Sequence, residues 1–512
     1  MQRISKTIDL YDIATFTASP WAGESVFPRK AIDRTPPPKF AEIRERLPAP
    51  QWEGHADTIA CYWKAWELAF GNLRIPEENI GFVSPYIDTA FNGCIFMWDS
   101  VFMLHFGRYG SAAFNFQQTL DNFYARQHKD GFICREISWS DGSERFERND
   151  VSSTGPNLMP WSEWEYYLNT GDKERLAAVF PPLLAYTTWF RTWRSWPDGS
   201  YFSSGWGCGM DNQPRLPPGC EPAWEHGFMS WIDTTCQQIL ANRCLIEMGR
   251  VLGREQDVAT LAEESGRLKE HVNAKMWSRR KKFYFDRFRD GALSDVKTIG
   301  AYWALLADII PAERLDAFVA HLRNKREFNR PHRVPTLSAD HPDYNPDGGY
   351  WNGAVWAPTN YMVLRGLTKV GQDELAHEIA CNHVGNVVAA FVKQGTLFEN
   401  YAPEKAEGKC TPNFVGWTGV PPITVLFEYV FGLRPDVGAR TLLWDVRLLE
   451  EHGVQRYPFG KGTELDLHCA RRQSPDEEPK IQVRSTTDLN LIVKWAQGQK
   501  TIKLHAGEAR QY

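Results

Sequence analysis

Two carboxylates in polar, aromatic-rich segments carry the strongest chemical signal in this chain. Asp211 lies in the run GWGCGMDNQPR over residues 205–215, where three glycines permit sharp bends and Pro214 stiffens the backbone. Glu399 lies far downstream in the run FENYAPE over residues 398–404. A proton-donating carboxyl group facing a carboxylate is the pair that acid-catalysed cleavage of a glycosidic bond requires. Either segment alone is more often a simple turn, so the pairing needs support from other landmarks.

Aromatic and polar runs supply those landmarks. FMWDSVF over residues 96–102 places Trp98 beside Asp99, and YWNGAVWAP over residues 350–358 enters a predicted helix. RQHKDGFI over residues 126–133 follows another helix, and VGWT ends at residue 418. Indole rings can stack on the apolar face of a sugar, and carboxylates and amides can bind its hydroxyls.

Together these runs, in this order, resemble those of glycoside hydrolase family 63 and the mannosylglycerate-hydrolase-like enzymes, which are relatives of the trehalases. The resemblance implies an (α/α)6 barrel with its site in a funnel at one end. It implies that Asp211 is the general acid and Glu399 the general base of an inverting reaction. The remaining residues assigned to the sugar site are Trp98, Asp99, Gln127, Trp206, Asn212, Arg215, Trp351, Asn352, Trp356, Tyr401 and Trp417.

Several of these residues have a second interpretation. Asp99 could cap the helix that follows it, with or without binding sugar. Arg215 would lower the pKa of Asp211 if it lay close to it, so we expect Arg215 to hold the substrate or the loop instead. Burial beside Trp206 is expected to keep Asp211 protonated near neutral pH. Glu404 is interpreted as a surface charge.

Two positions depart from the family pattern and leave the substrate open. The segment STGPN over residues 153–157 stands where the family usually has Thr-Gln-Pro-Pro, so Gly155 replaces a glutamine. Asn352 stands where relatives often carry arginine. The prediction is therefore an exo-acting inverting α-glycosidase for a small α-linked glucoside or mannoside, whose identity these motifs do not fix.

The pattern along the chain predicts three parts. Residues 1–56 are rich in proline and aromatic residues and are predicted to form an extended arm packed on the barrel. Residues 57–436 carry helical periodicity at 57–70, 229–252 and 375–391, separated by long loops at 130–160, 197–228 and 331–352. Residues 437–512 show strand-like runs near 463–469, 480–484, 489–495 and 501–505, which predict a small β-rich domain.

Composition limits the partners and the location. The 512 residues carry a net charge of −5, which favours neither nucleic acid nor an anionic membrane as a partner. No signal peptide, membrane span or CxxC pair is found, and the 10 cysteines are scattered, so we expect a cytoplasmic protein with reduced thiols. No cofactor or metal is expected, because the acidic loop at 340–349 does not have the spacing of an EF-hand. The oligomeric state is left open.

Two other functions remain as alternatives. An isomerase resembling the N-acylglucosamine epimerases would use histidines as acid and base, but none of the 13 histidines lies in the two carboxylate segments. A non-catalytic sugar-binding protein would keep the same aromatic runs without turnover. Incubation with α-glycosides distinguishes hydrolysis, epimerisation and binding alone.

Overall fold

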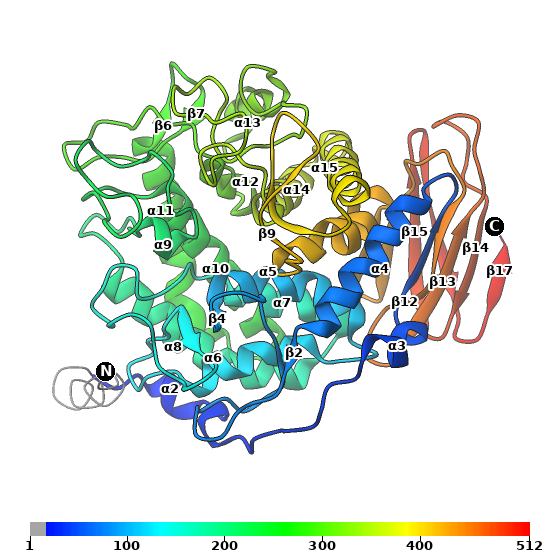
Figure 1. Ribbon diagram of the computed structural model, residues 1–512, viewed down its shortest axis with the longest axis horizontal. Coiled ribbons are helices and arrows are strands. Elements are labelled where there is room, and N and C mark those ends of the chain that lie inside the picture. Colours follow the sequence, from blue (N-terminus) through cyan, green and yellow to red (C-terminus); the bar gives the residue numbers. More distant parts are fainter. Residues whose placement is uncertain (1–16, 512) are drawn as a thin grey trace.

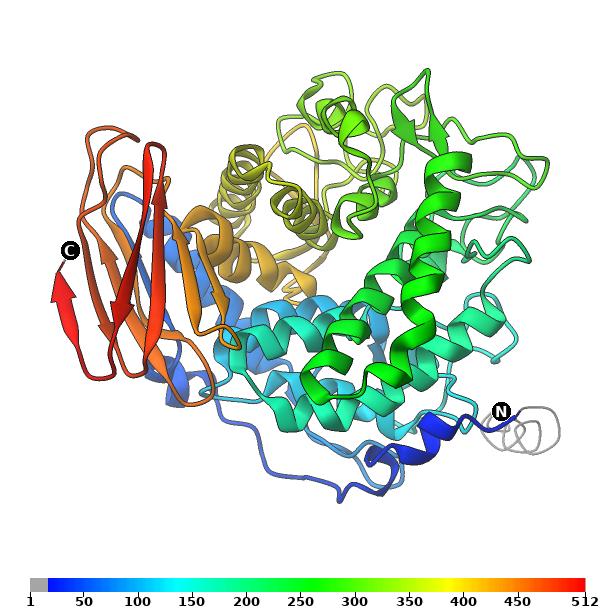
Figure 2. The same ribbon diagram turned by 180° about the vertical axis from the view of Figure 1, so that it is seen from behind.

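The computed structural model describes residues 17–511, in which a helical body carries a β-rich part on one side (Figures 1 and 2). Helices fill the left and centre of Figure 1, and the strands that follow residue 433 lie at its right edge. The predicted helix-rich chain with a C-terminal β-rich part is confirmed at this level.

Six helices contact one another in a cyclic order. Each packs against the next, and the last, a π-helix, returns to the first. All residues of the first and last helices are buried, as expected for helices with protein on every side. In order of contact the helices are α5 (Met97–Gly107), α7 (Met159–Thr170), α10 (Ile232–Leu252), α12 (Trp303–Leu306), α14 (Ala357–Lys369) and η9 (Val420–Val430).

Further helices pack against these six. α8 contacts α7 and α10, α11 contacts α10, and both α4 and α15 contact η9. α11 buries Leu261, Glu264, Leu268 and Val272 at three- and four-residue spacing, so it presents one face to the protein. Their bounds are α4 (Ala56–Gly71), α6 (Asp121–Ala125), α8 (Lys173–Trp193), α11 (Ala259–Lys275), α13 (Ala312–Val319) and α15 (Asp373–Gln394). The helices predicted at 57–70, 229–252 and 375–391 are confirmed as α4, α10 and α15.

Helix ends follow local capping chemistry. The Asp172 side chain accepts a hydrogen bond from the backbone N–H of Arg175 and so caps α8. α10 and α15 end at Gly253 and Gly395, both in the left-handed conformation that glycine adopts without strain. These residues explain why long helices stop where the loops begin.

The C-terminal strands form a five-stranded and a four-stranded sheet. The order is β1-β12-β13-β14-β17 in the first and β10-β11-β15-β16 in the second, and only β11 and β15 pair in parallel. β14 alternates buried and exposed residues, which matches one buried face. The bounds are β10 (Leu433–Asp436), β11 (Thr441–Asp445), β12 (His452–Pro458), β13 (Glu464–Cys469), β14 (Ile481–Ser485), β15 (Leu489–Trp495), β16 (Gly498–Leu504) and β17 (Ala509–Gln511). The four predicted strands are confirmed as β13 to β16.

The described part of the N-terminal segment, residues 17–56, follows the lower edge of the helical body in Figure 1. Lys30 forms an ion pair with buried Asp121, and Phe27 packs on Tyr124. The segment then supplies an edge strand to the C-terminal sheet, a pairing that the sequence did not predict. Its elements are α2 (Pro20–Glu24), η1 (Phe27–Arg29), α3 (Phe40–Ile43), η2 (Arg44–Arg46) and β1 (Ala49–Trp52).

Short elements interrupt the long loops, and two pairs of short strands lie at the site. β4 (Cys94–Phe96) pairs with β5 (Glu136–Ser138), and β8 (Phe398–Tyr401) pairs with β9 (Gly408–Pro412). The others are β2 (Leu73–Arg74), β3 (Tyr86–Ile87), β6 (Trp277–Ser278), β7 (Phe283–Tyr284), α9 (Gly205–Cys208), η3 (Arg108–Gly110), η4 (Phe116–Leu120), η5 (Glu255–Val258), η6 (Ile299–Tyr302), η7 (Ala320–Arg323) and η8 (Trp417–Gly419).

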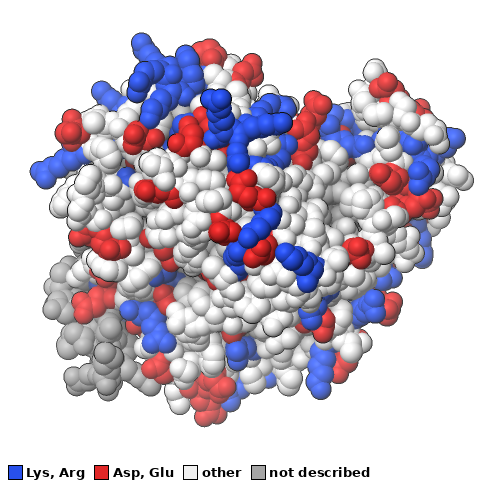
Figure 3. Space-filling model, turned by 45° about the horizontal axis from the view of Figure 1, so that its top comes forward, with Lys and Arg blue, Asp and Glu red and all other residues white. Residues whose placement is uncertain are grey.

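Two surface properties bear on partners. On the face seen in Figure 3, acidic and basic side chains lie interspersed over most of the surface, with a group of basic side chains at the upper left. Among residues 17–511, no helix combines the length and the apolar composition needed to cross a membrane.

Candidate active site

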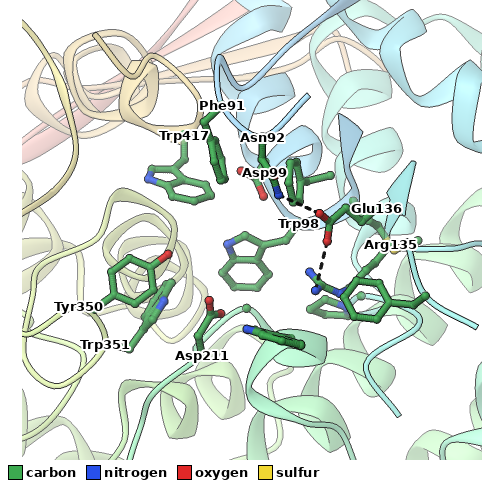
Figure 4. A pocket seen from close by; sticks show the side chains of 17 residues that line it. Phe91, Asn92, Trp98, Asp99, Arg135, Glu136, Asp211, Tyr350, Trp351 and Trp417 are labelled. Atoms are coloured by element: carbon green, nitrogen blue, oxygen red, sulfur yellow. Dashed lines mark hydrogen bonds and ion pairs between the residues drawn. The ribbon is translucent and has the colours of Figure 1, made fainter. Parts of the chain in front are cut away.

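A pocket of about 340 Å³ collects aromatic rings and carboxyl groups from distant parts of the chain (Figure 4). This volume lies within the range of small-molecule sites, roughly 300–1,000 Å³. Asp99, Glu136 and Asp211 provide its acidic side chains. The residues that line it are Phe91, Asn92, Phe96, Met97, Trp98, Asp99, Arg135, Glu136, Phe146, Gly155, Pro156, Trp206, Gly209, Asp211, Tyr350, Trp351 and Trp417.

The loop that carries Asp211 follows the single-turn helix α9. The Ser204 hydroxyl accepts a hydrogen bond from the Gly207 N–H and so caps that turn. Gly209 ends it with φ +79°, and a Cβ there would stand 2.9 Å from the indole of Trp98. Glycine is thus required twice over at this position, by the backbone angle and by the ring. The loop therefore lies directly on Trp98.

Burial is the main influence on Asp211. The pKa of this carboxyl is raised to about 6: burial raises it most, the positive charge of Arg135 lowers it, and the negative charge of Glu399 raises it. A carboxyl with such a pKa keeps its proton in weakly acidic solution, as a proton donor must. The expectation that burial keeps Asp211 protonated is supported, with a transition slightly below neutral pH.

Glu399 lies on β8 and is held by hydrogen bonds to both of its carboxylate oxygens. Oε1 accepts from the Tyr350 hydroxyl at 3.1 Å. Oε2 accepts from the Thr411 hydroxyl at 2.9 Å and from its N–H at 3.4 Å. The Trp417 indole N–H also binds the Glu399 carbonyl oxygen at 2.7 Å. The side chain, 5% exposed, is thus fixed in orientation beside the pocket wall that Tyr350 forms.

Asp99 lies at the start of α5 but does not cap it. The residue at the N-cap is Phe96, and no side chain caps this helix. Asp99 is buried, and its Oδ1 has no hydrogen-bond partner among the described residues. Burial raises its pKa well above the ordinary value, and the charge of Glu399 adds to the shift. A protonated Asp99 can donate to a hydroxyl as well as accept from one.

The tryptophans differ in their access to the pocket. Trp98, Trp206, Trp351 and Trp417 all line it. Trp356, another predicted contact, is fully buried and stacks on Trp351 with ring centroids 3.8 Å apart. Trp356 therefore supports Trp351 from behind and does not itself line the pocket.

Arg215 does not reach the pocket, which corrects its assignment to substrate binding. Its guanidinium forms ion pairs with Asp233 at 2.5 Å and Asp286 at 2.7 Å, and all three side chains are buried. It also lies over the Trp231 ring, 4.4 Å from the centroid. With its donors engaged by two carboxylates, Arg215 anchors the end of the Asp211 loop, the second of its two expected roles.

Gln127 and Tyr401 are also placed away from the pocket lining. The Gln127 amide donates to the backbone oxygens of Gly131 and Pro182, so it ties a turn to α8. Tyr401 is buried, and its hydroxyl accepts from the Phe398 N–H at 3.4 Å. Both side chains serve the local structure, so the prediction that they contact sugar is not supported by this geometry.

The Asn212 side chain and the Asn352 backbone form hydrogen bonds that hold the chain around the site. The Asn212 amide donates to the Gly349 oxygen at 3.1 Å and accepts from the Trp351 N–H at 2.9 Å. This pair of bonds joins the Asp211 loop to the segment that carries Tyr350 and Trp351. The Asn352 backbone pairs with Asn345 and Gly349, and its side chain is not part of the pocket lining.

Several pocket residues were missed in the sequence, among them Tyr350, Glu136, Asn92 and Arg135. Tyr350 opens a run that was recognised for its tryptophans; its backbone φ is +62°, and its hydroxyl donates to Glu399. Glu136 binds Asn92 at 3.1 Å and Arg135 at 3.3 Å, as the dashed lines in Figure 4 show. Asn92, Arg135 and Glu136 come together because β4 pairs with β5. No local motif predicts this contact between two distant segments.

Comparison with known proteins identifies the family of this chain. A sequence profile described as the mannosylglycerate hydrolase MGH1-like glycoside hydrolase domain matches residues 95–418, which is more than half of the chain. The chain therefore belongs to this family, and the protein is a glycoside hydrolase. The resemblance inferred from the motifs is confirmed.

Individual relatives are distant in sequence. The chain is 22% identical over 367 residues to an uncharacterized protein of Borreliella burgdorferi, covering 69% of this chain and 75% of that protein. It is 23% identical over 378 residues to mannosylglycerate hydrolase MGH1 of Selaginella moellendorffii, covering 61% and 76%. Against the probable mannosyl-oligosaccharide glucosidase of Schizosaccharomyces pombe, 23% identity extends over 279 residues, 48% of this chain and 34% of that protein.

Solved structures share the fold. The GH63 mannosylglycerate hydrolase of Thermus thermophilus in complex with glucose superposes with a TM-score of 0.58 at 20% identity, covering 71% of this chain and 99% of that one. The GH78 family rhamnosidase of Bacillus sp. GL1 gives 0.61 at 13% identity, covering 88% and 42%.

Proposed function

We propose that this glycoside hydrolase is an exo-acting α-glycosidase that cleaves a small α-linked glucoside or mannoside with inversion. One observation carries the proposal: Asp211, whose pKa is raised to about 6, shares an aromatic pocket with Tyr350, which holds Glu399 in place. A proton donor and a fixed carboxylate are the two groups that such a reaction needs.

In this proposal Asp211 is the general acid. It donates its proton to the glycosidic oxygen while the bond between that oxygen and the anomeric carbon breaks, so the leaving group departs as an alcohol. The carboxyl is left as a carboxylate, which Arg135 and solvent at the pocket stabilise. Burial supports the role because it favours the protonated form before the reaction.

Glu399 is the general base. It removes a proton from a water molecule, whose oxygen attacks the anomeric carbon on the face opposite the leaving group. Tyr350 and Thr411 each donate to a different oxygen of Glu399 and so fix the plane of the carboxylate. Such fixing matters because a misdirected base loses its alignment with the water.

The sugar that is cleaved off would lie between aromatic walls. Trp98 and Trp351 both line the pocket, and Trp351 is stiffened by its stack on Trp356. The unpartnered Oδ1 of Asp99 provides a buried polar group for a sugar hydroxyl. A sugar lacking that hydroxyl would leave the carboxyl unsatisfied, which gives selectivity.

The fold supports the same proposal. We propose that the six helices in cyclic contact are the inner ring of an (α/α)6 barrel within a catalytic domain of residues 57–436. Residues 1–56 would be an arm on this domain, and residues 437–512 a β-rich domain, to which β1 and β10 also contribute strands. The 10 cysteines are free thiols, which supports a cytoplasmic location.

The substrate is proposed from the relatives and the pocket together. The relatives named above include a mannosylglycerate hydrolase and a probable mannosyl-oligosaccharide glucosidase. Gly155 lines the pocket, and a Cβ there would stand 3.2 Å from the sulfur of Met97. A side chain at this position would therefore press on Met97, which also lines the pocket.

A panel of α-glucosides and α-mannosides, scored by released monosaccharide, tests the proposal. We expect Asp211→Asn to lose about 10²–10⁴-fold of its activity on substrates with poor leaving groups, the usual contribution of a general acid. The loss should be smaller for glycosyl fluorides, which need less proton assistance. Equal losses for both leaving groups would remove Asp211 from the acid role.

The same panel separates the alternatives. Histidine-based isomerisation is disfavoured because no histidine is among the described residues that line the pocket. Epimerised sugar without a released alcohol would nevertheless support it. Saturable binding with no product would indicate a non-catalytic sugar-binding protein.

A further inference from the structure

Two tryptophans form a continuous aromatic surface from the pocket to the exterior. Trp206 lines the pocket, and its ring centroid lies 5.5 Å from that of Trp224. Trp224 does not line the pocket and is 50% exposed, although it is one of the largest apolar side chains. Trp224 thus extends the apolar surface of the pocket outward, and apolar surface continuous with a pocket is suited to contact a ligand.

The backbone fixes these two rings relative to each other. The N–H groups of Gly205 and Trp206 donate to the oxygens of Pro222 and Ala223 at 2.9 and 2.8 Å. A Cβ at Gly205 would stand 2.5 Å from the Pro222 oxygen, so only glycine permits this approach. The segments are therefore in direct contact at the position of Trp206.

The turn that presents Trp224 is closed by its own residues. The Glu225 carboxylate accepts from the Glu221 N–H at 2.8 Å, and the Glu225 N–H donates to the Glu221 oxygen at 3.1 Å. Because the turn is closed on both sides of Trp224, less backbone ordering is needed when a ligand binds the ring.

The surface lies on the side of the proposed acid. The Met210 N–H donates to the Gly205 oxygen at 3.0 Å, and a Cβ on Gly205 would be 2.5 Å from the Asp211 carbonyl oxygen. Asp211 and Trp206 therefore extend from one tight turn. Since a general acid contacts the glycosidic oxygen, a leaving group beside Asp211 can reach the ring of Trp206.

We infer that the leaving group is an oligosaccharide of at least two sugar units, the first stacked on Trp206 and the second on Trp224. The inference rests on the proposed function, since it uses Asp211 as the acid. Sugar rings have apolar C–H faces that suit indole, and their hydroxyls stay in water at an exposed site. A three-carbon leaving group such as glycerate would end within the pocket and leave Trp224 uncovered.

The test compares two substrates that share the same cleaved sugar. An α-glycosyl fluoride has no leaving saccharide, whereas the matching α-linked trisaccharide places two sugars on the aromatic surface. We expect Trp224→Ala to lower the ratio of kcat/KM for the trisaccharide to that for the fluoride by about tenfold, equivalent to about 1.4 kcal/mol of lost contact. Trp224→Phe should restore most of the ratio because it keeps an aromatic face.

Trp193→Ala is the matched control, because Trp193 is 45% exposed and does not line the pocket. It should leave the ratio unchanged, and unfolding curves should verify that all three variants are folded. If Trp224→Ala keeps the wild-type ratio, or if Trp193→Ala lowers it equally, the surface is not a leaving-group site. If the wild-type protein cleaves neither substrate, the proposed function fails first, and this inference fails with it.

Discussion

The pKa of Asp211 has a direct consequence for catalysis. Because the pKa in the folded protein is raised to about 6, the acid is protonated below that pH and loses its proton as the pH rises through it. The kcat/KM for a poor leaving group should therefore fall about tenfold per pH unit well above pH 6. Asp211→Asn should abolish this alkaline limb, which rate profiles from pH 4 to pH 9 would reveal. An unchanged limb in the variant would assign it to another group.

Glu399 and Glu404 provide a matched pair of substitutions at the residue scale. Glu404 binds Arg330 through a two-point ion pair and also accepts from Tyr344, and Arg330 is the main reason that its pKa is lowered. We expect Glu399→Gln to lose turnover of a glycoside while retaining its binding, because an amide cannot take a proton from water. Glu404→Gln should remain active.

Turnover rates and calorimetric affinities of the two variants decide between the carboxylates. Should Glu404→Gln be inactive and Glu399→Gln active, the base would have to be reassigned. Loss of sugar affinity in Glu399→Gln would instead indicate a binding role.

Residue types and motifs pointed to Asp211 and Glu399 as candidate catalytic residues, but they did not predict the role of each neighbouring residue. Asp211 and Glu399 lie in runs whose composition points to catalysis. Arg215 lies in the same run, yet its charge is neutralised by Asp233 and Asp286, partners 18 and 71 positions away. A sequence read locally cannot distinguish an arginine that faces the ligand from one that faces two buried aspartates.

At the scale of elements, the periodicity of apolar residues predicted the helices and strands that have a clear pattern of their own. α4, α10 and α15 each repeat apolar residues at helical spacing, and β13 to β16 alternate. β1 was missed because its partner β12 lies about 400 residues away, and strands this short carry little pattern of their own. The pairing of β4 with β5, which are separated by several helices, was missed for the same reason, and so were the positions of Arg135 and Glu136 in the pocket.

At the scale of the whole molecule, the proposed reaction depends on bringing two distant segments to one pocket. Asp211 lies between α9 and α10, and Glu399 follows α15, so helices placed far apart in the chain set the separation of the two carboxyl groups. If that separation admits a water molecule beside the sugar, the reaction inverts the anomeric centre; if it does not, a covalent intermediate forms and the configuration is retained.

Proton NMR of the fresh product measures this outcome. From an α-linked substrate we expect the β-anomer to appear first and the α-anomer to grow in only as the free sugar mutarotates. Recording within the first few turnovers at low temperature keeps mutarotation slow enough to separate the two signals. First appearance of the α-anomer would show that Glu399 acts as a nucleophile, because a double displacement restores the starting configuration. The assignment of both carboxylates to catalysis would survive that result, whereas the proposal of inversion would not.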